Sequence, residues 1–102
     1  MIYLSHPYGG KKENANEVAE IMMKLMNDYP NLIFFSPIHN FPCYENINYE
    51  IGLQRCIDFL PYCKSMIVTG DYKNSKGCLA EIQFCEKHKI PIEYKSVDEI
   101  LK

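Results

Sequence analysis

The sequence lacks the patterns that mark several common classes of protein. It has no C-x-x-C pair, which argues against a zinc ribbon or a thioredoxin-like site. The G-x-G-x-x-G and Walker A motifs are both absent, so neither a dinucleotide-dependent redox enzyme nor a P-loop NTPase is expected. No apolar stretch approaches the roughly 18 residues that a membrane span needs. The first ten residues lack the basic start of a signal peptide, and we therefore expect a cytoplasmic protein without contact to the membrane.

An excess of charge of one sign is also missing. The chain of 102 residues has a net charge of −2, which gives no broad attraction to nucleic acid or to anionic lipid. The hydrophobic share of 47% and the charged share of 24% are those of a globular protein. No repeat or linker interrupts the chain, so residues 1–102 are expected to form a single domain.

The cysteines are odd in number: Cys43, Cys56, Cys63, Cys78 and Cys85. Two pairs are separated by seven residues, a spacing that places both members of a pair on one face of a helix. We expect buried free thiols in a reducing compartment rather than disulfides.

Strand patterns and helix patterns alternate along the chain. Short β-rich runs predict strands at 2–5, 32–36, 65–70 and 90–94. Apolar side chains at helical spacing predict helices at 13–28, 48–60 and 75–89, and Ser96 with Glu99 predicts a capping box on a final turn. Residues 38–47 have no clear period and are expected to form a loop.

This alternation predicts an α/β fold: a small open Rossmann-like (flavodoxin-like) parallel sheet of four to five strands with helices on both faces. In such sheets ligands bind beyond the carboxyl ends of the strands. The candidate substrate-binding residues at these ends are Ser5, His6, Pro7, Gly9, Gly10, Pro37, His39, Gly70, Asp71, Ser75, Lys76 and Gly77.

Several of these residues have more than one interpretation. The Gly9-Gly10 loop and the Ser75–Gly77 turn could hold an anion, or they could serve only as turns with a solvated lysine. His6 and His39 could share a metal, but two histidines without a third ligand more often form hydrogen bonds. No metal or organic cofactor is therefore expected.

Glu81 is the strongest candidate for chemistry. Its neighbours one turn away on the predicted helix are Gly77, Cys78, Phe84 and Cys85, so it has no cationic partner there. Such a carboxylate must be exposed at the crevice, be paired, or have a raised pKa. We expect an exposed, unpaired carboxylate on the rim, as a glycosyl nucleophile requires, although a boundary glutamate pointing into water has the same pattern.

Three segments together resemble the nucleoside 2-deoxyribosyltransferase-like superfamily, which includes the 2′-deoxynucleoside 5′-phosphate N-hydrolases. They are Y-L-S-H-P-Y-G-G (3–10), F-S-P (35–37) and the S-x-G-x-x-x-E pattern of Ser75, Gly77 and Glu81. The resemblance covers residues 2–94 and is closest to short bacterial and phage members.

The resemblance implies roles for individual residues. Glu81 would be the nucleophile that attacks C1′ of the sugar, and Tyr8 would help to orient both the glutamate and the sugar. Ser75 stands where the monophosphate hydrolases bind the 5′-phosphate, which, with Lys76 beside it, favours a phosphorylated substrate. Asp58 is an imperfect counterpart of the family's aspartate near the base, because its spacing to the third strand differs by about one residue.

The function expected is that of an N-glycosidase, an enzyme that cleaves or transfers the base–sugar bond of a nucleotide or nucleoside through a covalent glycosyl-Glu81 intermediate. One alternative is a non-catalytic module that binds a nucleotide or a nucleotide-derived signal. Another is a metal-dependent phosphohydrolase that uses His6 and His39. The identity of the base and of the sugar, and the choice between hydrolysis and transfer, stay open. A homodimer or higher homo-oligomer is expected, with the aromatic residues Phe41, Tyr44 and Tyr49 as a surface for the partner.

Overall fold

Four short apolar runs form the strands of one parallel sheet. The structure is a computed structural model, and it describes residues 1–8, 11–37 and 48–102. The strands are β1 (Ile2–Ser5), β2 (Phe34–Phe35), β3 (Ser65–Val68) and β4 (Ile92–Tyr94), in the spatial order β2-β1-β3-β4. The order of the strands reverses between β1 and β3, which makes this the topological switch point of the sheet. The predicted α/β fold with a parallel sheet is confirmed.

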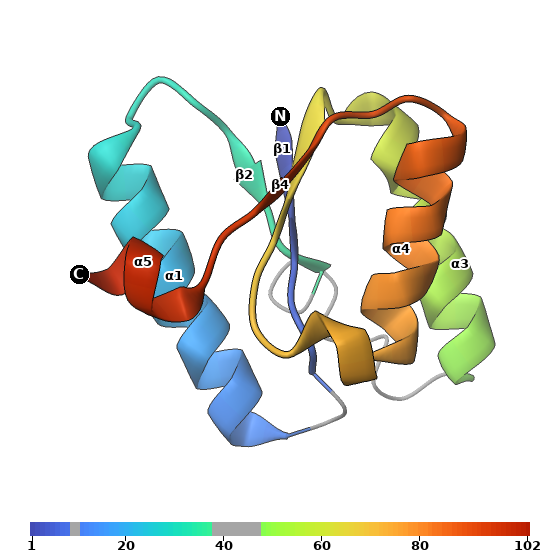
Figure 1. Cartoon of the computed structure of the whole chain (residues 1–102), viewed down its shortest axis with the longest axis horizontal. Coiled ribbons are helices and arrows are strands. Elements are labelled where there is room, and N and C mark those ends of the chain that lie inside the picture. Colours follow the sequence, from blue (N-terminus) through green and yellow to red (C-terminus); the bar gives the residue numbers. More distant parts are fainter. Residues whose placement is uncertain (9–10, 38–47) are drawn as a thin grey trace.

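Helices cover both faces of this sheet. Helices α1 (Lys12–Asp28) and α5 (Val97–Leu101) lie on one face, and α3 (Tyr49–Phe59) and α4 (Lys76–Lys87) lie on the other (Figure 1). Short 3₁₀ helices follow α3 and precede α4, at η2 (Leu60–Tyr62) and η3 (Tyr72–Asn74). Side-chain caps begin three of the α-helices: Asn48 for α3, Ser75 for α4, and the predicted capping box of Ser96 and Glu99 for α5.

The alternation of side chains along β1 divides the interior into two cores. Ile2 and Leu4 point to the α1 face, where they pack in one cluster with Val18 and Ile21. Tyr3 points to the other face and joins the cluster beneath α3 and α4. Successive residues of a strand face opposite sides, so Ser5 follows Tyr3 toward α4. This alternation decides which side chains of β1 can meet the helix that carries Glu81.

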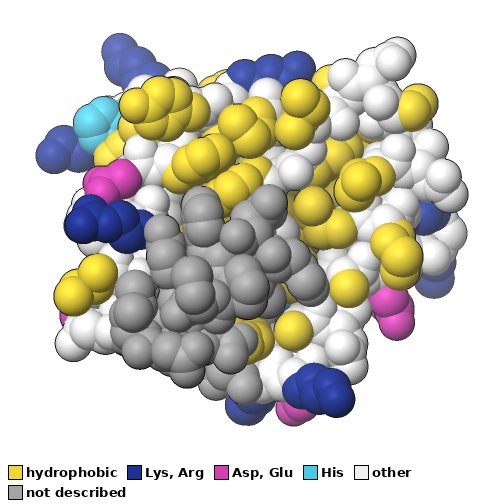
Figure 2. Space-filling view, turned by 180° about the vertical axis from the view of Figure 1, so that it is seen from behind, with side chains coloured by type: hydrophobic (Ala, Val, Ile, Leu, Met, Phe, Trp, Pro, Cys, Tyr) yellow, Lys and Arg dark blue, Asp and Glu magenta, His cyan; other side chains and the backbone are white. Residues whose placement is uncertain are grey.

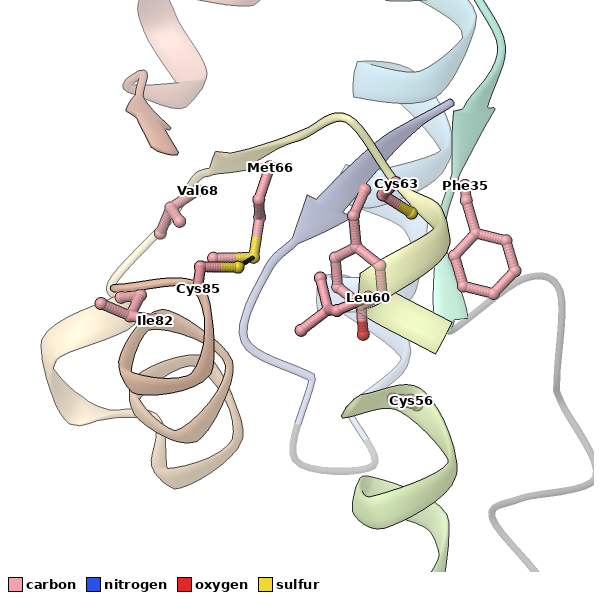
Figure 3. Packing of buried hydrophobic residues seen from close by; sticks show 9 residues of the cluster. Phe35, Cys56, Leu60, Cys63, Met66, Val68, Ile82 and Cys85 are labelled. Atoms are coloured by element: carbon pink, nitrogen blue, oxygen red, sulfur yellow. Dashed lines mark hydrogen bonds between the residues drawn. The ribbon is translucent and has the colours of Figure 1, made fainter. Parts of the chain in front are cut away.

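The cysteines contribute to the core beneath α3 and α4. Cys56, Cys63, Cys78 and Cys85 are buried free thiols, as expected, and Cys43 lies outside the described residues. Figure 3 shows Cys85 beside Met66, with the two sulfur atoms 3.9 Å apart. Burial raises the pKa of the Cys85 thiol to about 11, so the group stays protonated and packs as a small apolar side chain.

Three strands are shorter than their apolar runs predict. Of the run 32–36, only Phe34 and Phe35 form a strand, because β2 is an edge strand that pairs with two residues of β1. Strand β3 ends at Val68 because Gly70 adopts a positive φ of 73°. Strand β4 begins after Pro91, since the Ile90 N–H still closes the end of α4 on the carbonyl of Cys85. The predicted loop at 38–47 lies outside the described residues.

The α4-side core offers a direct test of the packing. Leu60 is fully buried there, and we expect Leu60→Ala to lower the free energy of unfolding by about 3 kcal/mol, because the change leaves a cavity. Leu79→Ala is the matched control, since Leu79 is 41% exposed on α4 and its truncation should cost less than about 1 kcal/mol. Urea unfolding measures both values. Equal losses in the two variants would contradict this assignment of the core.

Candidate functional site

Glu81 lies in the second turn of α4, on the side of the helix that packs against the sheet. The Ser75 hydroxyl caps the helix by accepting the Cys78 N–H at 3.2 Å, and the helix then places Cys78, Glu81, Ile82 and Cys85 on its buried face. Glu81 is only 7% exposed. The expected exposed position on a rim is therefore wrong. The physical reason is the helical period, because a residue three positions after Cys78 and four before Cys85 shares their inward face.

The carboxylate of Glu81 is also paired, contrary to the expectation of an unpaired group. The Ser5 hydroxyl donates to Oε1 at 2.7 Å, and the Tyr3 hydroxyl donates to Oε2. Both donors come from β1, across the interface between strand and helix, whereas the expectation considered only neighbours on the same helix. Each carboxylate oxygen thus has one hydroxyl donor, and each keeps further lone-pair capacity.

Burial shifts the acidity of this cluster. It raises the pKa of Glu81 to about 6, while the hydrogen bonds from Tyr3 and Ser5 act in the opposite direction because they stabilise the charged form. Burial, together with the carboxylate beside it, raises the pKa of Tyr3 well above its usual value of 10, so the phenol remains a donor. Of the three possibilities for Glu81, the structure thus combines pairing with a raised pKa.

Tyr3 is not among the residues expected at the site, yet its hydroxyl contacts Glu81. The resemblance implied Tyr8 at this carboxylate, and the tyrosine whose hydroxyl donates to Glu81 is Tyr3. The backbone carbonyl of Tyr8 accepts hydrogen bonds from the Lys11 N–H at 3.0 Å and from Asn14 Nδ2 at 2.9 Å, and so helps to begin α1. The period of two along β1 was the available signal, because it places Tyr3 and Ser5 on one face.

Three other candidates form local contacts that give each a structural role. Asp58 is exposed on α3, where it accepts hydrogen bonds from Gln54 at 2.8 Å and Arg55 at 3.2 Å. Asp58 thus lies on a solvated face of α3. Ser75 is the N-cap of α4, and Lys76 forms an exposed ion pair with Glu50 at 3.0 Å. Gly77 follows in the first turn of the same helix.

The ends of β1 and β3 do meet, and they form a cleft of about 400 Å³. Four of its lining residues are expected candidates: His6, Pro7, Gly70 and Asp71. Four others were not expected, namely Lys11, Asn14, Glu17 and Asn74, of which the first three come from the start of α1 and its N-cap. Pro37 follows β2 and is half-buried, while Gly9, Gly10 and His39 lie outside the described residues. The cleft is thus polar and carries charges of both signs.

His6 has partners for both of its ring nitrogens. Nδ1 lies 2.7 Å from Thr69 Oγ1, and Nε2 lies 3.1 Å from Glu17 Oε1. Burial lowers the pKa of His6, and the Glu17 carboxylate opposes that shift. Gly70 packs against the imidazole so closely that a Cβ at this position would lie 2.7 Å from His6 Cε1, and its φ of 73° also favours glycine. The shape of this corner therefore depends on His6 and Gly70 together.

The residues that the structure describes contain no group of three histidine, cysteine or acidic side chains arranged to hold a metal ion. His39, the expected partner of His6 at a metal, lies outside the described residues. Among these same residues no helix is both long enough and apolar enough to span a bilayer.

Comparison with known proteins adds no assignment. A scan against protein-family models gives no match to this chain, and a comparison with curated protein sequences also gives no significant match. The chemistry of the site therefore has to be argued from its own residues.

The raised pKa of Glu81 predicts a pH-dependent stability. The folded value of about 6 lies above the ordinary value of 4.5, so ionised Glu81 opposes folding by about 2 kcal/mol. This cost is absent below about pH 4.5, grows between 4.5 and 6, and is complete above 6. Glu81→Gln removes it, and we expect the variant to gain stability relative to wild type as pH rises through this window. Urea unfolding at pH 4.5 and pH 7.5 measures the difference.

The matched control is Glu86→Gln, which makes the same chemical change at an exposed position of α4. Its free energy of unfolding should stay within about 1 kcal/mol of the wild-type value at both pH values, because the side chain is exposed. A Glu81→Gln difference that is the same at both pH values would contradict the raised pKa.

Proposed function

We propose that the chain is an N-glycosidase of the nucleoside 2-deoxyribosyltransferase-like type, with Glu81 as its nucleophile. The observation that carries the proposal is the orientation of Glu81: one hydroxyl donor holds each oxygen, from Tyr3 and from Ser5, in place of the exposed and unpaired group that the sequence predicted. Its place beside the end of β1 adds support, because β1 and β3 form the switch point where sheets of this kind bind ligands.

The acidity of Glu81 suits this reaction. A carboxylate with a pKa of about 6 is more basic than an ordinary one, and at pH 7 it is still mostly ionised. In the proposed reaction a Glu81 oxygen bonds to C1′ of the sugar while the C1′–N bond breaks, and the base leaves with the electron pair of that bond and takes up a proton. Water then attacks C1′ and regenerates the carboxylate.

Tyr3 and Ser5 orient the nucleophile in this mechanism. Their hydroxyls hold the two oxygens from the β1 side, so that the remaining lone pairs point in defined directions. Pre-orientation of this kind reduces the reorganisation that the reaction requires. The same donors stabilise the free carboxylate when the glycosyl ester is hydrolysed.

The proposed substrate is a nucleotide or a nucleoside. Lys11 lines the cleft near the ends of β1 and β3, where a phosphate would meet its charge. Lys76 begins α4 beside Ser75 and forms an ion pair with Glu50. The proposal requires no metal and no organic cofactor, since the carboxylate and water supply both steps.

A second candidate, a non-catalytic binding module for a nucleotide or a nucleotide-derived signal, is favoured by one observation. The polar cleft of about 400 Å³ is lined by His6, Lys11 and Glu17 among others, but Glu81 is not among its lining residues. A ligand confined to this cleft would be bound without contact to the carboxylate.

Glu81→Gln separates the two candidates. The neutral amide keeps the shape of the side chain but cannot form the glycosyl ester, nor can it offset the positive charge of the oxocarbenium-like transition state. We expect base release to fall by at least about a thousandfold, while ligand binding largely survives. Chromatography of reactions with nucleosides, nucleotides and NAD-derived compounds measures base release, and calorimetry measures binding.

Glu86→Gln again serves as the control and should release base at the wild-type rate. Binding without base release by the wild-type protein would favour the binding module. Near wild-type turnover in Glu81→Gln would overturn the role of Glu81.

A homodimer is also proposed. The support is the number of large apolar side chains that the described part of the chain exposes, including Ile51 on α3, Tyr62 on η2 and Leu79 on α4. Figure 2 shows hydrophobic side chains gathered on one face, around the residues that are not described. Phe41 and Tyr44 of the expected partner surface lie outside the described residues, and so does the side chain of Tyr49.

Light scattering tests the assembly. At micromolar concentration we expect twice the mass of the 11.9 kDa chain, and Tyr62→Lys, a charge placed at a side chain that is 76% exposed, should shift the protein toward the monomer if η2 lies in the interface. A wild-type protein that is monomeric at this concentration would remove the proposal.

A further inference from the structure

The two polar clusters on opposite faces of the sheet are joined at Ser5. On the α4 side, the Ser5 hydroxyl donates to Glu81 at 2.7 Å. In the sheet itself, the Ser5 carbonyl accepts the Thr69 N–H at 3.0 Å and lies 3.3 Å from the Thr69 hydroxyl. On the α1 side, that hydroxyl lies 2.7 Å from His6, which in turn contacts Glu17. Two sets of hydrogen bonds, one from Glu17 to the Ser5 carbonyl and one from the Ser5 hydroxyl to Glu81, are thus joined by the covalent bonds of Ser5.

The number of protons in the set from Glu17 to the Ser5 carbonyl depends on the charge of His6. Thr69 has one hydroxyl proton and two neighbours that could accept it, His6 Nδ1 and the Ser5 carbonyl. A neutral imidazole carries one N–H, and the carboxylate of Glu17 accepts only. With the proton on Nε2, His6 donates to Glu17 and accepts from Thr69. With the proton on Nδ1, the Nε2 lone pair would face the Glu17 carboxylate, which is unfavourable.

Protonation of His6 changes this arrangement. The cation carries a proton on both nitrogens, so Nδ1 becomes a donor to Thr69 Oγ1 while Nε2 still donates to Glu17. The Thr69 hydroxyl proton must then turn to its other neighbour, the Ser5 carbonyl. The imidazole itself has little room to move, because it packs directly against Gly70.

We propose that His6 and Thr69 are positioning residues for Glu81, and that protonation of His6 turns the Thr69 hydroxyl from the imidazole to the Ser5 carbonyl. Thr69 holds the Ser5 peptide, and the Ser5 hydroxyl holds Oε1 of Glu81. The protonation state of His6 therefore changes the hydrogen bonding of the Glu81 carboxylate on the other face of the sheet. The effect on turnover rests on the proposed function, whereas the effect on the acidity of Glu81 does not.

The charges around His6 support this role. Glu17 from α1 is within ion-pair distance of Nε2, and Lys11 and Asp71 line the same cleft from the N-cap of α1 and from the loop after β3. Burial lowers the pKa of His6 from 6.5 and raises that of Glu81 from 4.5 to about 6.

The first experiment compares Thr69→Val with Thr69→Ser by following the ¹³C signal of the Glu81 carboxyl through a pH titration by NMR. Valine has the shape of threonine but no hydroxyl, whereas serine keeps the hydroxyl. Without the hydroxyl, the Ser5 carbonyl keeps only the Thr69 N–H, so the Ser5 peptide is held less firmly when His6 is protonated, and the Ser5 donor that lowers the pKa of Glu81 weakens. We expect the Glu81 midpoint to rise by about half a pH unit or more in Thr69→Val and to stay at the wild-type value in Thr69→Ser.

A loss of stability alone would not move this midpoint, so the titration distinguishes positioning from a merely structural role. Equal midpoints in wild type, Thr69→Val and Thr69→Ser would overturn the proposal. In turnover, the acid limb of kcat should shift with the Glu81 midpoint while KM changes little. Absence of base release in the wild type would overturn the proposed function, and the NMR titration would still decide on the positioning role.

A second measurement needs no variant. The ¹⁵N shifts of the His6 ring report which nitrogen carries the proton, and we expect the Nε2–H form at high pH and a fully protonated ring at low pH. The Glu81 signal should also show a second inflection at the midpoint of His6. An Nδ1–H tautomer at high pH would overturn the proposal. So would a Glu81 signal without an inflection at the midpoint of His6.

Discussion

The hydrogen bonds from Tyr3 and Ser5 to Glu81 are the contact on which the site depends, because they join the first strand to the helix on its face. Burial alone would leave an unpaired charge in the core, which is among the most unfavourable arrangements in a folded protein. Two hydroxyl donors, one for each oxygen, make the buried carboxylate tolerable without a cation. Burial keeps the pKa of Glu81 raised even though both hydroxyl donors act in the opposite direction.

The packing of the surrounding core offsets the free-energy cost of burying ionised Glu81. Ionised Glu81 opposes folding by about 2 kcal/mol, a substantial part of the stability of a chain of this size. Around it the same face of the sheet is well packed, with Leu60, Met66 and Cys85 fully buried. Ionised Glu81 lowers the stability of the fold and is nevertheless present in its core. Such a residue suits a functional role better than a structural one.

The sequence was sufficient to predict the fold but only part of the site. The alternation of strand and helix periods, and the capping box at Ser96, are local signals and predict the elements well. Which face of α4 turns inward, and which strand lies opposite, are tertiary facts, and the burial of Glu81 follows from both. The contact between Tyr3 and Glu81 joins residues 78 positions apart, so no local pattern indicates it. The cleft residues Asn14 and Glu17 face His6 for the same reason, because α1 packs across the end of β1.

The position of Ser5 brings the two polar clusters together at the end of one strand. Side chains alternate along β1, so Tyr3 and Ser5 reach Glu81 on one face, while His6, the next residue along the chain, reaches Glu17 on the other. The peptide between Ser5 and His6 joins two side chains that lie on opposite faces. The N–H of Thr69, the residue directly after β3, donates to the carbonyl of this peptide. Side chains of neighbouring residues thus lie on opposite faces of the sheet, while the peptide that joins the residues is common to both faces. At the end of β1, the Thr69 hydroxyl adds to the backbone hydrogen bond on the Ser5 carbonyl, and this second donor is the one that the proposed protonation of His6 would redirect.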